Sequence, residues 1–230
     1  MAQFAIGDTH GCAKTFAALL DQIQLSPSDE LFMLGDYIDR GPDSKGVVDQ
    51  VWKLREDGYR VHCLMGNHEQ MLLESLMPGG ELSYETWLHN GGEAALRSFG
   101  LQDNSPVSLI PKPYLKFFAQ LDLHLESNGY ILVHAGLNFE DPDPLNDVNG
   151  LLWIRDFYDS IDLEWLDGRI ILHGHTPKAA NQIKFQLTML PKVPVLNLDA
   201  GCVFNRGPYR SLCAFNMTTR ELYFQPNIEA

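Results

Sequence analysis

The chain has 230 residues, of which 45% are hydrophobic, and it carries a formal net charge of −13. This length and composition suffice for one substantial core, so we expect a single globular domain over residues 1–230. The negative charge argues against a nucleic acid duplex or an anionic membrane as partner, because clustered Lys and Arg bind both. A phosphorylated ligand would need metal ions or a few arginines to supply positive charge locally.

The cysteines and the first residues indicate the compartment. The four cysteines, Cys12, Cys63, Cys202 and Cys213, lack the spacing of a zinc ribbon or a disulfide-rich scaffold. Reduced thiols in a cytosolic protein are their simplest interpretation. Residues 1–6 contain no basic segment before a long apolar stretch, which predicts neither a signal peptide nor a membrane span. We therefore expect a cytoplasmic protein.

The first strand is predicted at residues 3–6, and a glycine-flanked loop with Asp8 and His10 follows it. A helix is then predicted over residues 12–23 from its apolar stripe. Taken alone, Asp8 could cap this helix and His10 could be a surface histidine. Together, an Asp and a His in one tight loop after a strand would also make the first half of a metal site.

The strongest motif is Gly35-Asp36-Tyr37-Ile38-Asp39-Arg40-Gly41, which follows the apolar run 31–34. It places two carboxylates and a guanidinium between two glycines. The pattern predicts a buried strand that delivers polar groups to the carboxyl edge of a sheet, where α/β proteins bind ligands. A helix is predicted next, over residues 44–57. A strand with a charged surface turn would be the alternative if the motif stood alone.

A third unit of the same kind follows. Residues 59–65 predict a strand, Gly66-Asn67-His68-Glu69 comes directly after it, and residues 69–77 predict a helix. Three successive units in which a strand leads through glycine and polar residues to a helix favour a largely parallel sheet. In such a sheet the functional loops lie along one edge.

Residues 78–113 interrupt this pattern with short predicted helices over 82–89 and 93–99. The segment has too few apolar residues for a core of its own, so we expect a helical insertion beside the site. Trp87 and Asn90 could line a substrate cleft, although a packing Trp and a turn Asn are the favoured interpretation. Another short helix is predicted over 115–121.

The second half of the chain reads mainly as strands, predicted at 123–127, 130–133, 169–172, 195–198, 211–215 and 221–225. Asn128-Gly129 suits a hairpin between the first two, and the last two form a closing hairpin. Residues 178–192 show no clear period. Three of these strands end in polar residues close to glycine: His134, then His173 and His175, then Asp199.

Five of the eight histidines stand just after an apolar run beside a glycine: His10, His68, His134, His173 and His175. A satisfied core histidine would explain one of them but hardly five. Adding Asp8, Asp36 and Asn67 gives an oxygen and nitrogen ligand set without thiolate, which suits Mn²⁺, Fe or Zn²⁺ in an open site. A shared carboxylate could bridge two ions about 3.5–4 Å apart, an arrangement used for displacement at phosphorus.

The ordered motifs resemble those of the phosphoprotein phosphatase family of calcineurin-like metallophosphoesterases, in its small bacterial and bacteriophage-lambda-type branch. The motifs are Asp8-Thr9-His10-Gly11, the Gly35–Gly41 stretch, Gly66-Asn67-His68-Glu69, His134-Ala135-Gly136 and Gly174-His175. The resemblance runs from residue 7 to about residue 201. It implies an α/β/β/α sandwich of two mixed sheets flanked by helices.

The resemblance also implies roles. Two divalent metal ions, Mn²⁺ first and Fe or Zn²⁺ as alternatives, would be held by Asp8, His10, Asp36, Asn67, His134 and His175, with Asp36 bridging. His68 would be the general acid and Asp39 the carboxylate that orients it. Arg40 and Arg155 would grip phosphate oxygens.

Other residues near the motifs receive lesser roles. Pro177 stands where many metallophosphoesterases outside this family have a second histidine, so the first metal should have one protein ligand fewer. We expect His173 and Asp199 to support the ligands rather than bind metal. For Cys12 we expect a packing role.

The resemblance implies a phosphatase that hydrolyses phosphomonoesters by in-line attack of a metal-bridging hydroxide. Phosphoserine and phosphothreonine of proteins are the first expectation and phosphotyrosine the second, because the chain is close to a minimal catalytic core. The alternative is a dinucleoside polyphosphate or nucleotide hydrolase, since relatives of this motif set attack phosphoanhydrides. Retention of His68 and Asp39 argues against a third option, a non-catalytic phosphate-sensing scaffold.

Overall fold

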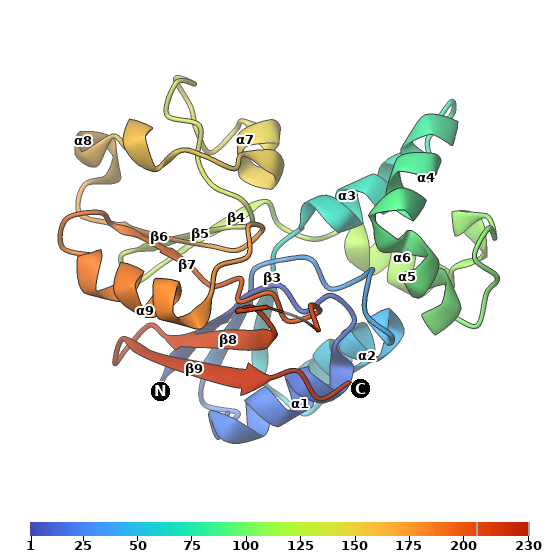
Figure 1. Cartoon of the computed structure of the whole chain (residues 1–230), viewed down its shortest axis with the longest axis horizontal. Coiled ribbons are helices and arrows are strands. Elements are labelled where there is room, and N and C mark those ends of the chain that lie inside the picture. The colour runs from blue at the N-terminus through green and yellow to red at the C-terminus, as the bar shows by residue number, and fades with distance from the viewer. Residues whose placement is uncertain (206, 230) are drawn as a thin grey trace.

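The computed structural model describes residues 1–205 and 207–229, which form two sheets (Figure 1). The strands of the first sheet, in spatial order, are β3 (Arg60–Cys63), β2 (Glu30–Met33), β1 (Gln3–Ile6), β8 (Ser211–Asn216) and β9 (Glu221–Pro226). Strands β1, β2 and β3 are parallel, whereas β8 and β9 are antiparallel to their neighbours. The three parallel strands therefore end at one edge, as the repeated units predict.

The second sheet is smaller and also mixed. Its strands are β4 (His124–Ser127), β5 (Tyr130–Val133), β6 (Ile170–His173) and β7 (Val195–Asn197). Strand β4 forms the predicted hairpin with β5, and β5, β6 and β7 are parallel. The predicted fold class, two mixed sheets flanked by helices, is confirmed.

Side chains that alternate along the strands build the layers of the sandwich. In β2, Leu31 and Met33 join the core under the helices of the first sheet, whereas Phe32 joins the core between the sheets. In β5, Leu132 also points between the sheets and Ile131 to the opposite side. Strands β1, β5 and β6 are buried along their whole length, which explains why they read as continuous apolar runs.

Helices cover the outer faces of both sheets. The first sheet is flanked by α1 (Ala13–Gln22) and α2 (Ser44–Glu56), and the second by α7 (Val148–Trp153) and α8 (Leu163–Leu166) (Figure 1). Helix α2 begins where the Asp43 carboxylate accepts a hydrogen bond from Gly46 N–H at 2.8 Å. Both α1 and α2 start near the carboxyl ends of the strands that precede them.

The 78–113 segment is helical, as predicted. It contains α4 (Glu81–Trp87), the π-helical turn η1 (Leu88–Gly92), α5 (Glu93–Ser98), the 3₁₀ turn η2 (Val107–Leu109) and the start of α6 (Lys112–Phe118). Trp87 and Leu96 belong to the core of the first sheet. The segment thus packs on that core, in line with its low apolar content.

Several elements differ from the prediction. Helix α9 (Ala180–Met189) lies in the stretch without clear period, because Ile183 is its one buried residue and leaves no apolar stripe. Helix α3 (Asn67–Glu74) begins two residues earlier than predicted, and η3 (Tyr158–Ser160) is an additional 3₁₀ turn. Among the described residues, none of the helices combines the length and the apolarity needed to cross a bilayer.

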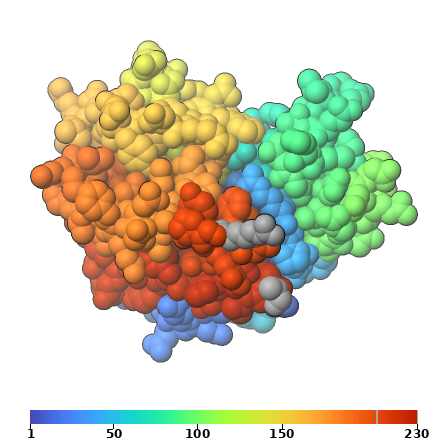
Figure 2. Space-filling view, in the orientation of Figure 1, coloured from blue at the N-terminus to red at the C-terminus, as the bar shows by residue number. Residues whose placement is uncertain are grey.

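The surface is notched above the edge where the parallel strands end. Figure 2 shows a hollow between a lobe coloured yellow, from the middle of the chain, and a green lobe that contains the 78–113 segment. Blue atoms from the first quarter of the chain lie at its floor. The notch gives the polar loops after the strands a route to solvent.

Candidate active site

Every residue predicted to bind metal follows the carboxyl end of a strand. Asp8 and His10 follow β1, Asp36 follows β2, Asn67 begins α3 after β3, and His134 and His175 follow β5 and β6. All six side chains are buried. The edges of both sheets thus contribute to one polar cluster, as parallel strands allow.

Asp36 is the centre of this cluster. Two groups of potential ligands share it, His10 with Asp36 and His68, and Asp36 with His134 and His175; within each group the ligand atoms lie within 4.8 Å of one another. The Nε2 atoms of His10 and His134 each lie 3.5 Å from an Asp36 oxygen, on different oxygens. A carboxylate with a histidine facing each oxygen suits the predicted bridging position.

The second group fits a divalent cation. His134 Nδ1 donates to the Leu34 carbonyl at 2.9 Å, so its Nε2 carries a lone pair. That lone pair faces Asn67 Oδ1, another acceptor, at 3.0 Å. His175 Nε2 is buried and has no hydrogen-bond partner among the described residues. Asn67 Oδ1 also contacts His175 Nδ1, at 2.9 Å. A cation would give His175 Nε2 the partner it lacks, and it would separate the lone pairs of His134 Nε2 and Asn67 Oδ1.

The charges of the cluster are suited to metal binding. Burial lowers the pKa of His175 to about 3 and that of His10 well below its ordinary value, so both are neutral ligands at pH 7. Burial opposes ionisation of Asp36, but His134 and the other nearby histidines hold the pKa of its carboxyl well below its usual range. Asp36 is therefore a carboxylate.

The Asp8 carboxylate lies against the backbone of the loop after β6. Its carboxylate accepts the backbone N–H of His175 at 3.0 Å, and the absence of a side chain at Gly174 makes room for this approach. In the described part of the chain, neither ligand group includes Asp8. Burial and the charges of Asp199 and Asp36 raise the pKa of Asp8 well above its ordinary value.

His68, a member of the first group, forms a buried pair with Asp39. His68 Nδ1 donates to Asp39 Oδ2 at 2.6 Å, and the two side chains are 1% and 0% exposed. The other ring nitrogen, Nε2, lies 3.9 Å from Asp36 Oδ2. Burial opposes protonation of His68, but the Asp36 and Asp39 charges outweigh burial and raise its pKa.

The two arginines differ in their surroundings. Arg40 follows directly after Asp39, and its Nη1 donates to His10 Nε2 at 2.7 Å. Arg155 is exposed beyond the end of α7. After burial and the His134 charge, the Arg155 charge also helps to lower the pKa of His175. Of the two arginines, Arg40 is the one that contacts a predicted ligand.

The backbone of the cluster is held in the left-handed region at five positions other than glycine. Their φ angles are 43° at His10, 51° at Asp36, 71° at Asp39, 66° at Arg40 and 69° at His175. This conformation is uncommon for residues with side chains, and its concentration here indicates a functional site.

Glycines let the loops approach one another at this edge. Gly66 lies against the Asp36 carboxylate, where any side chain would collide with it. The φ of Gly35 is 101°, and its Cα lies close to Gly66 and to the His134 ring. The strand ends thus meet without side chains between them.

Glu69 is a structural residue of the site to which sequence reasoning assigned no role. Its buried carboxylate accepts backbone N–H groups from Asp36 at 3.0 Å, Tyr37 at 2.8 Å and Gly66 at 3.0 Å. It therefore ties the loop after β2 to the start of α3. The Gly66-to-Glu69 spacing before a helix, which resembles a capping box, is the signal that could have identified it.

The remaining candidates lie around the cluster. His173 contacts the Tyr158 hydroxyl through Nε2 at 2.6 Å, and Asp199 accepts the Gly201 N–H at 2.8 Å. Among the described residues, neither belongs to a ligand group. Cys12 is buried in the core, and Asn90 Nδ2 donates to the Thr86 carbonyl at 2.8 Å, a local contact within its helical segment.

The two sheets and the ligand groups at their shared edge define a metallophosphoesterase. The calcineurin-like phosphoesterase family matches residues 3–204, and the chain belongs to this family. The predicted resemblance is thereby confirmed at the level of the superfamily, whose members use divalent metal ions to hydrolyse phosphoesters.

The curated relatives carry a more specific name. A symmetrical bis(5'-nucleosyl)-tetraphosphatase from Nitrosospira multiformis is 35% identical over 138 residues, which are 60% of this chain and 44% of the relative. One from Erwinia tasmaniensis is 43% identical over 74 residues, 32% of this chain and 26% of the relative. The matched part of the chain thus spans less than half the length of these relatives.

Solved structures share the fold. A putative diadenosine tetraphosphatase superposes with a TM-score of 0.67 at 20% identity, covering 100% of this chain and 95% of that one. A cold-active protein tyrosine phosphatase gives 0.63 at 18% identity, covering 100% and 77%. A serine/threonine phosphatase from Saccharomyces cerevisiae gives 0.63 at 16% identity, covering 100% and 81%.

Proposed function

We propose that the chain hydrolyses dinucleoside polyphosphates, cleaving a bis(5'-nucleosyl) tetraphosphate with one water into two nucleoside diphosphates. The observation that carries this substrate class is the name shared by the curated relatives, symmetrical bis(5'-nucleosyl)-tetraphosphatase. It favours the alternative over the phosphoprotein substrates that we expected first, which these relatives do not support.

For the metal ions we propose the ligands Asp8, His10, Asp36, Asn67, His134 and His175. The Asp36-centred groups and the unpartnered Nε2 of His175 support this set. When bound, divalent ions would supply positive charge and an activated water for attack on phosphorus. Asp8 belongs to the proposed set because the family resemblance implies it and because its buried carboxylate contacts the backbone of the proposed ligand His175.

We propose His68 as the general acid. Its Nδ1–H donates to Asp39 and its Nε2 faces the ligand groups, where the departing oxygen would lie. The raised pKa of His68 favours the protonated form that such a role needs. Asp39 keeps the ring oriented and balances its charge.

Arg40 and Arg155 are proposed to bind phosphate oxygens. Guanidinium groups suit this task because their N–H groups can pair with two oxygens at once. Together with bound cations they would concentrate positive charge at the site of a chain whose net charge of −13 otherwise repels a polyphosphate. The contact between Arg40 and His10 supports the placement of this charge at the cluster.

The test compares diadenosine tetraphosphate with phosphoserine, phosphothreonine and phosphotyrosine peptides, using the purified full chain with Mn²⁺. We expect preference for the dinucleotide and ADP as the sole nucleotide product by chromatography. Equal amounts of AMP and ATP would contradict symmetrical cleavage, and preference for a phosphopeptide would overturn the substrate class. Asp36→Asn protein purified in parallel controls for contaminating phosphatases.

A further inference from the structure

The 78–113 segment reaches the active site at two neighbouring residues. The indole Nε1–H of Trp87 donates to both carboxylate oxygens of Asp39, at 3.0 and 2.9 Å. The carbonyl of Gly91 accepts the backbone N–H of Arg40 at 3.1 Å. The segment therefore contacts both the carboxylate that orients His68 and the adjacent arginine.

The Asp39 carboxylate depends on Trp87 for its orientation. Asp39 is 0% exposed, and the side chains that hydrogen-bond to its carboxylate in the described chain are His68 and Trp87. The indole N–H is shared by both oxygens, which fixes the plane of the carboxylate and leaves Oδ2 directed at His68 Nδ1. Without the indole N–H, only His68 would restrain rotation about the last bond of Asp39.

The sequence around Trp87 is shaped to hold the indole there. Trp87 is fully buried at the end of α4, and a side chain at Gly92 would collide with its ring. The φ of Gly91 is 110°, which brings the chain back against Arg40. Trp87, Gly91 and Gly92 thus act together, although the sequence alone suggests a packing residue and a turn.

We propose that Trp87 is a positioning residue for proton transfer, because its N–H holds Asp39 so that His68 presents Nε2 to the leaving oxygen. This inference rests on the proposed function of His68 as general acid. A tryptophan that served packing alone would affect the stability of the fold and would not change how the rate depends on the leaving group.

The experiment measures kcat for phenyl phosphate, a poor leaving group, and 4-nitrophenyl phosphate, an activated one, on the full chain with saturating Mn²⁺. The variants are Trp87→Phe and a protein with 3-benzothienylalanine at position 87, which keeps the indole shape and lacks the N–H. We expect kcat to fall roughly tenfold on phenyl phosphate and to change little on the activated ester. The tenfold loss is a fraction of the full contribution of a general acid. The isostere keeps the test valid if Trp87→Phe folds poorly.

The matched control is Tyr84→Phe. Tyr84 lies one helical turn earlier on α4 and donates to the Ser105 carbonyl at 2.9 Å, far from Asp39 in the hydrogen-bond network. It should leave the ratio of the two kcat values unchanged. In a His68→Asn background, loss of the Trp87 N–H should cause no further change, because both changes act on the same proton transfer.

A second readout does not need activity. In a proton NMR spectrum, the indole N–H signal of Trp87 is the one that disappears in Trp87→Phe. This signal should shift in Asp39→Asn. It should stay in place in the control Asp57→Asn, because Asp57 lies at the end of α2. If it does not move in Asp39→Asn, the contact is wrong and the inference fails.

The outcomes separate the inference from the proposed function. If His68→Asn makes kcat depend more steeply on the leaving group and the isostere at position 87 does not, the inference about Trp87 is overturned and the role of His68 stands. If His68→Asn itself leaves the dependence unchanged, the general-acid role fails and the inference fails with it. Loss of bound Mn²⁺ in the isostere protein, measured by elemental analysis, would also overturn a purely positioning role.

Discussion

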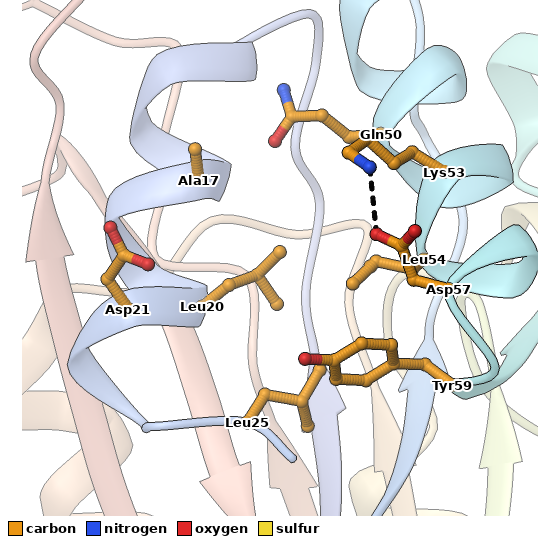
Figure 3. A pocket seen from close by; sticks show the side chains of 9 residues that line it. All are labelled: Ala17, Leu20, Asp21, Leu25, Gln50, Lys53, Leu54, Asp57 and Tyr59. Carbon is orange, nitrogen blue, oxygen red and sulfur yellow. Dashed lines mark hydrogen bonds and ion pairs between the residues drawn. The ribbon is translucent and has the colours of Figure 1, made fainter. Parts of the chain in front are cut away.

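Two pairs of opposite charge, similar in separation, lie in regions of contrasting character. His68 and Asp39 are 2.6 Å apart and almost fully buried at the strand ends, whereas Lys53 and Asp57 are 2.9 Å apart with 73% and 48% of their side chains exposed. The exposed pair borders a hollow between α1 and α2, with the Lys53 ammonium facing the Asp57 carboxylate (Figure 3). The buried pair lies among other buried groups of perturbed pKa, such as Asp36 and Glu69.

The hollow in Figure 3 has a volume of about 230 Å³, yet it has no such convergence of groups. Leu20, Leu25 and Tyr59 line it, and its charged groups lie where water screens them. It lies beside the second halves of α1 and α2, whereas both helices begin near the site. Burial and convergence of charge, rather than concavity, distinguish the two regions.

Removal of divalent metal should have the largest effect. We expect chelation to lower the rate of 4-nitrophenyl phosphate hydrolysis by about a thousandfold or more, because the metal ions stabilise the transition state by several kcal/mol. Added Mn²⁺ should restore the rate. If activity survives complete chelation, checked by elemental analysis, the buried cluster does not act through bound metal. The functional distinction between it and the surface pair would then be lost.

Two carboxylates three residues apart should behave differently. Asp36→Asn should lose bound metal, because Asp36 is shared by both ligand groups. Asp39→Asn should keep the metal and lower kcat on phenyl phosphate by about 10²-fold through His68. Metal content and kcat measured together test this division. Equal loss of metal in both variants would contradict it.

Gly91→Ala should have a smaller effect that is specific to Arg40. At φ of 110° an added side chain is strained and would press on Arg40, so we expect a several-fold rise in KM along with a loss of about 1 kcal/mol in stability. Gly100→Ala is the matched control, because its φ is 74° and it faces open space. It should lose similar stability at unchanged KM. A matching rise in KM in both variants would argue against the contact with Arg40.

Lys53→Met should have the smallest effect. Exposed ion pairs within one helical turn contribute little, so kcat and the melting temperature should both stay within experimental error of the parent chain. A clear loss of activity, measured with the same two aryl phosphates, would assign the hollow of Figure 3 a role that its exposed charges do not predict.

Local patterns predicted the strands and the loops after them. Asp36 and His68 were found because each stands in a short motif directly after an apolar run, and parallel strands bring such positions together. Helix α9 was missed because it buries one residue, Ile183, and so shows no stripe. The Trp87 contact joins residues 48 positions apart, and nothing in the local sequence of either indicates it.

The placement of Asp8 was also beyond local patterns. Its position after β1 predicts the right neighbourhood, but the backbone N–H of His175, 167 residues away, decides where its carboxylate points. Arg155 was assigned from resemblance alone, and its exposed position beyond α7 could not have been read from the sequence.

The shared position of Asp36 has a consequence for the stability of the folded chain. Asp36 follows a strand of the first sheet, whereas His134 and His175 follow strands of the second. An ion held by all three would act as a removable cross-link between the halves of the sandwich, one that the unfolded chain cannot form. Loss of the ion would then lower the free energy of unfolding, while the apolar layer between the sheets still holds them together.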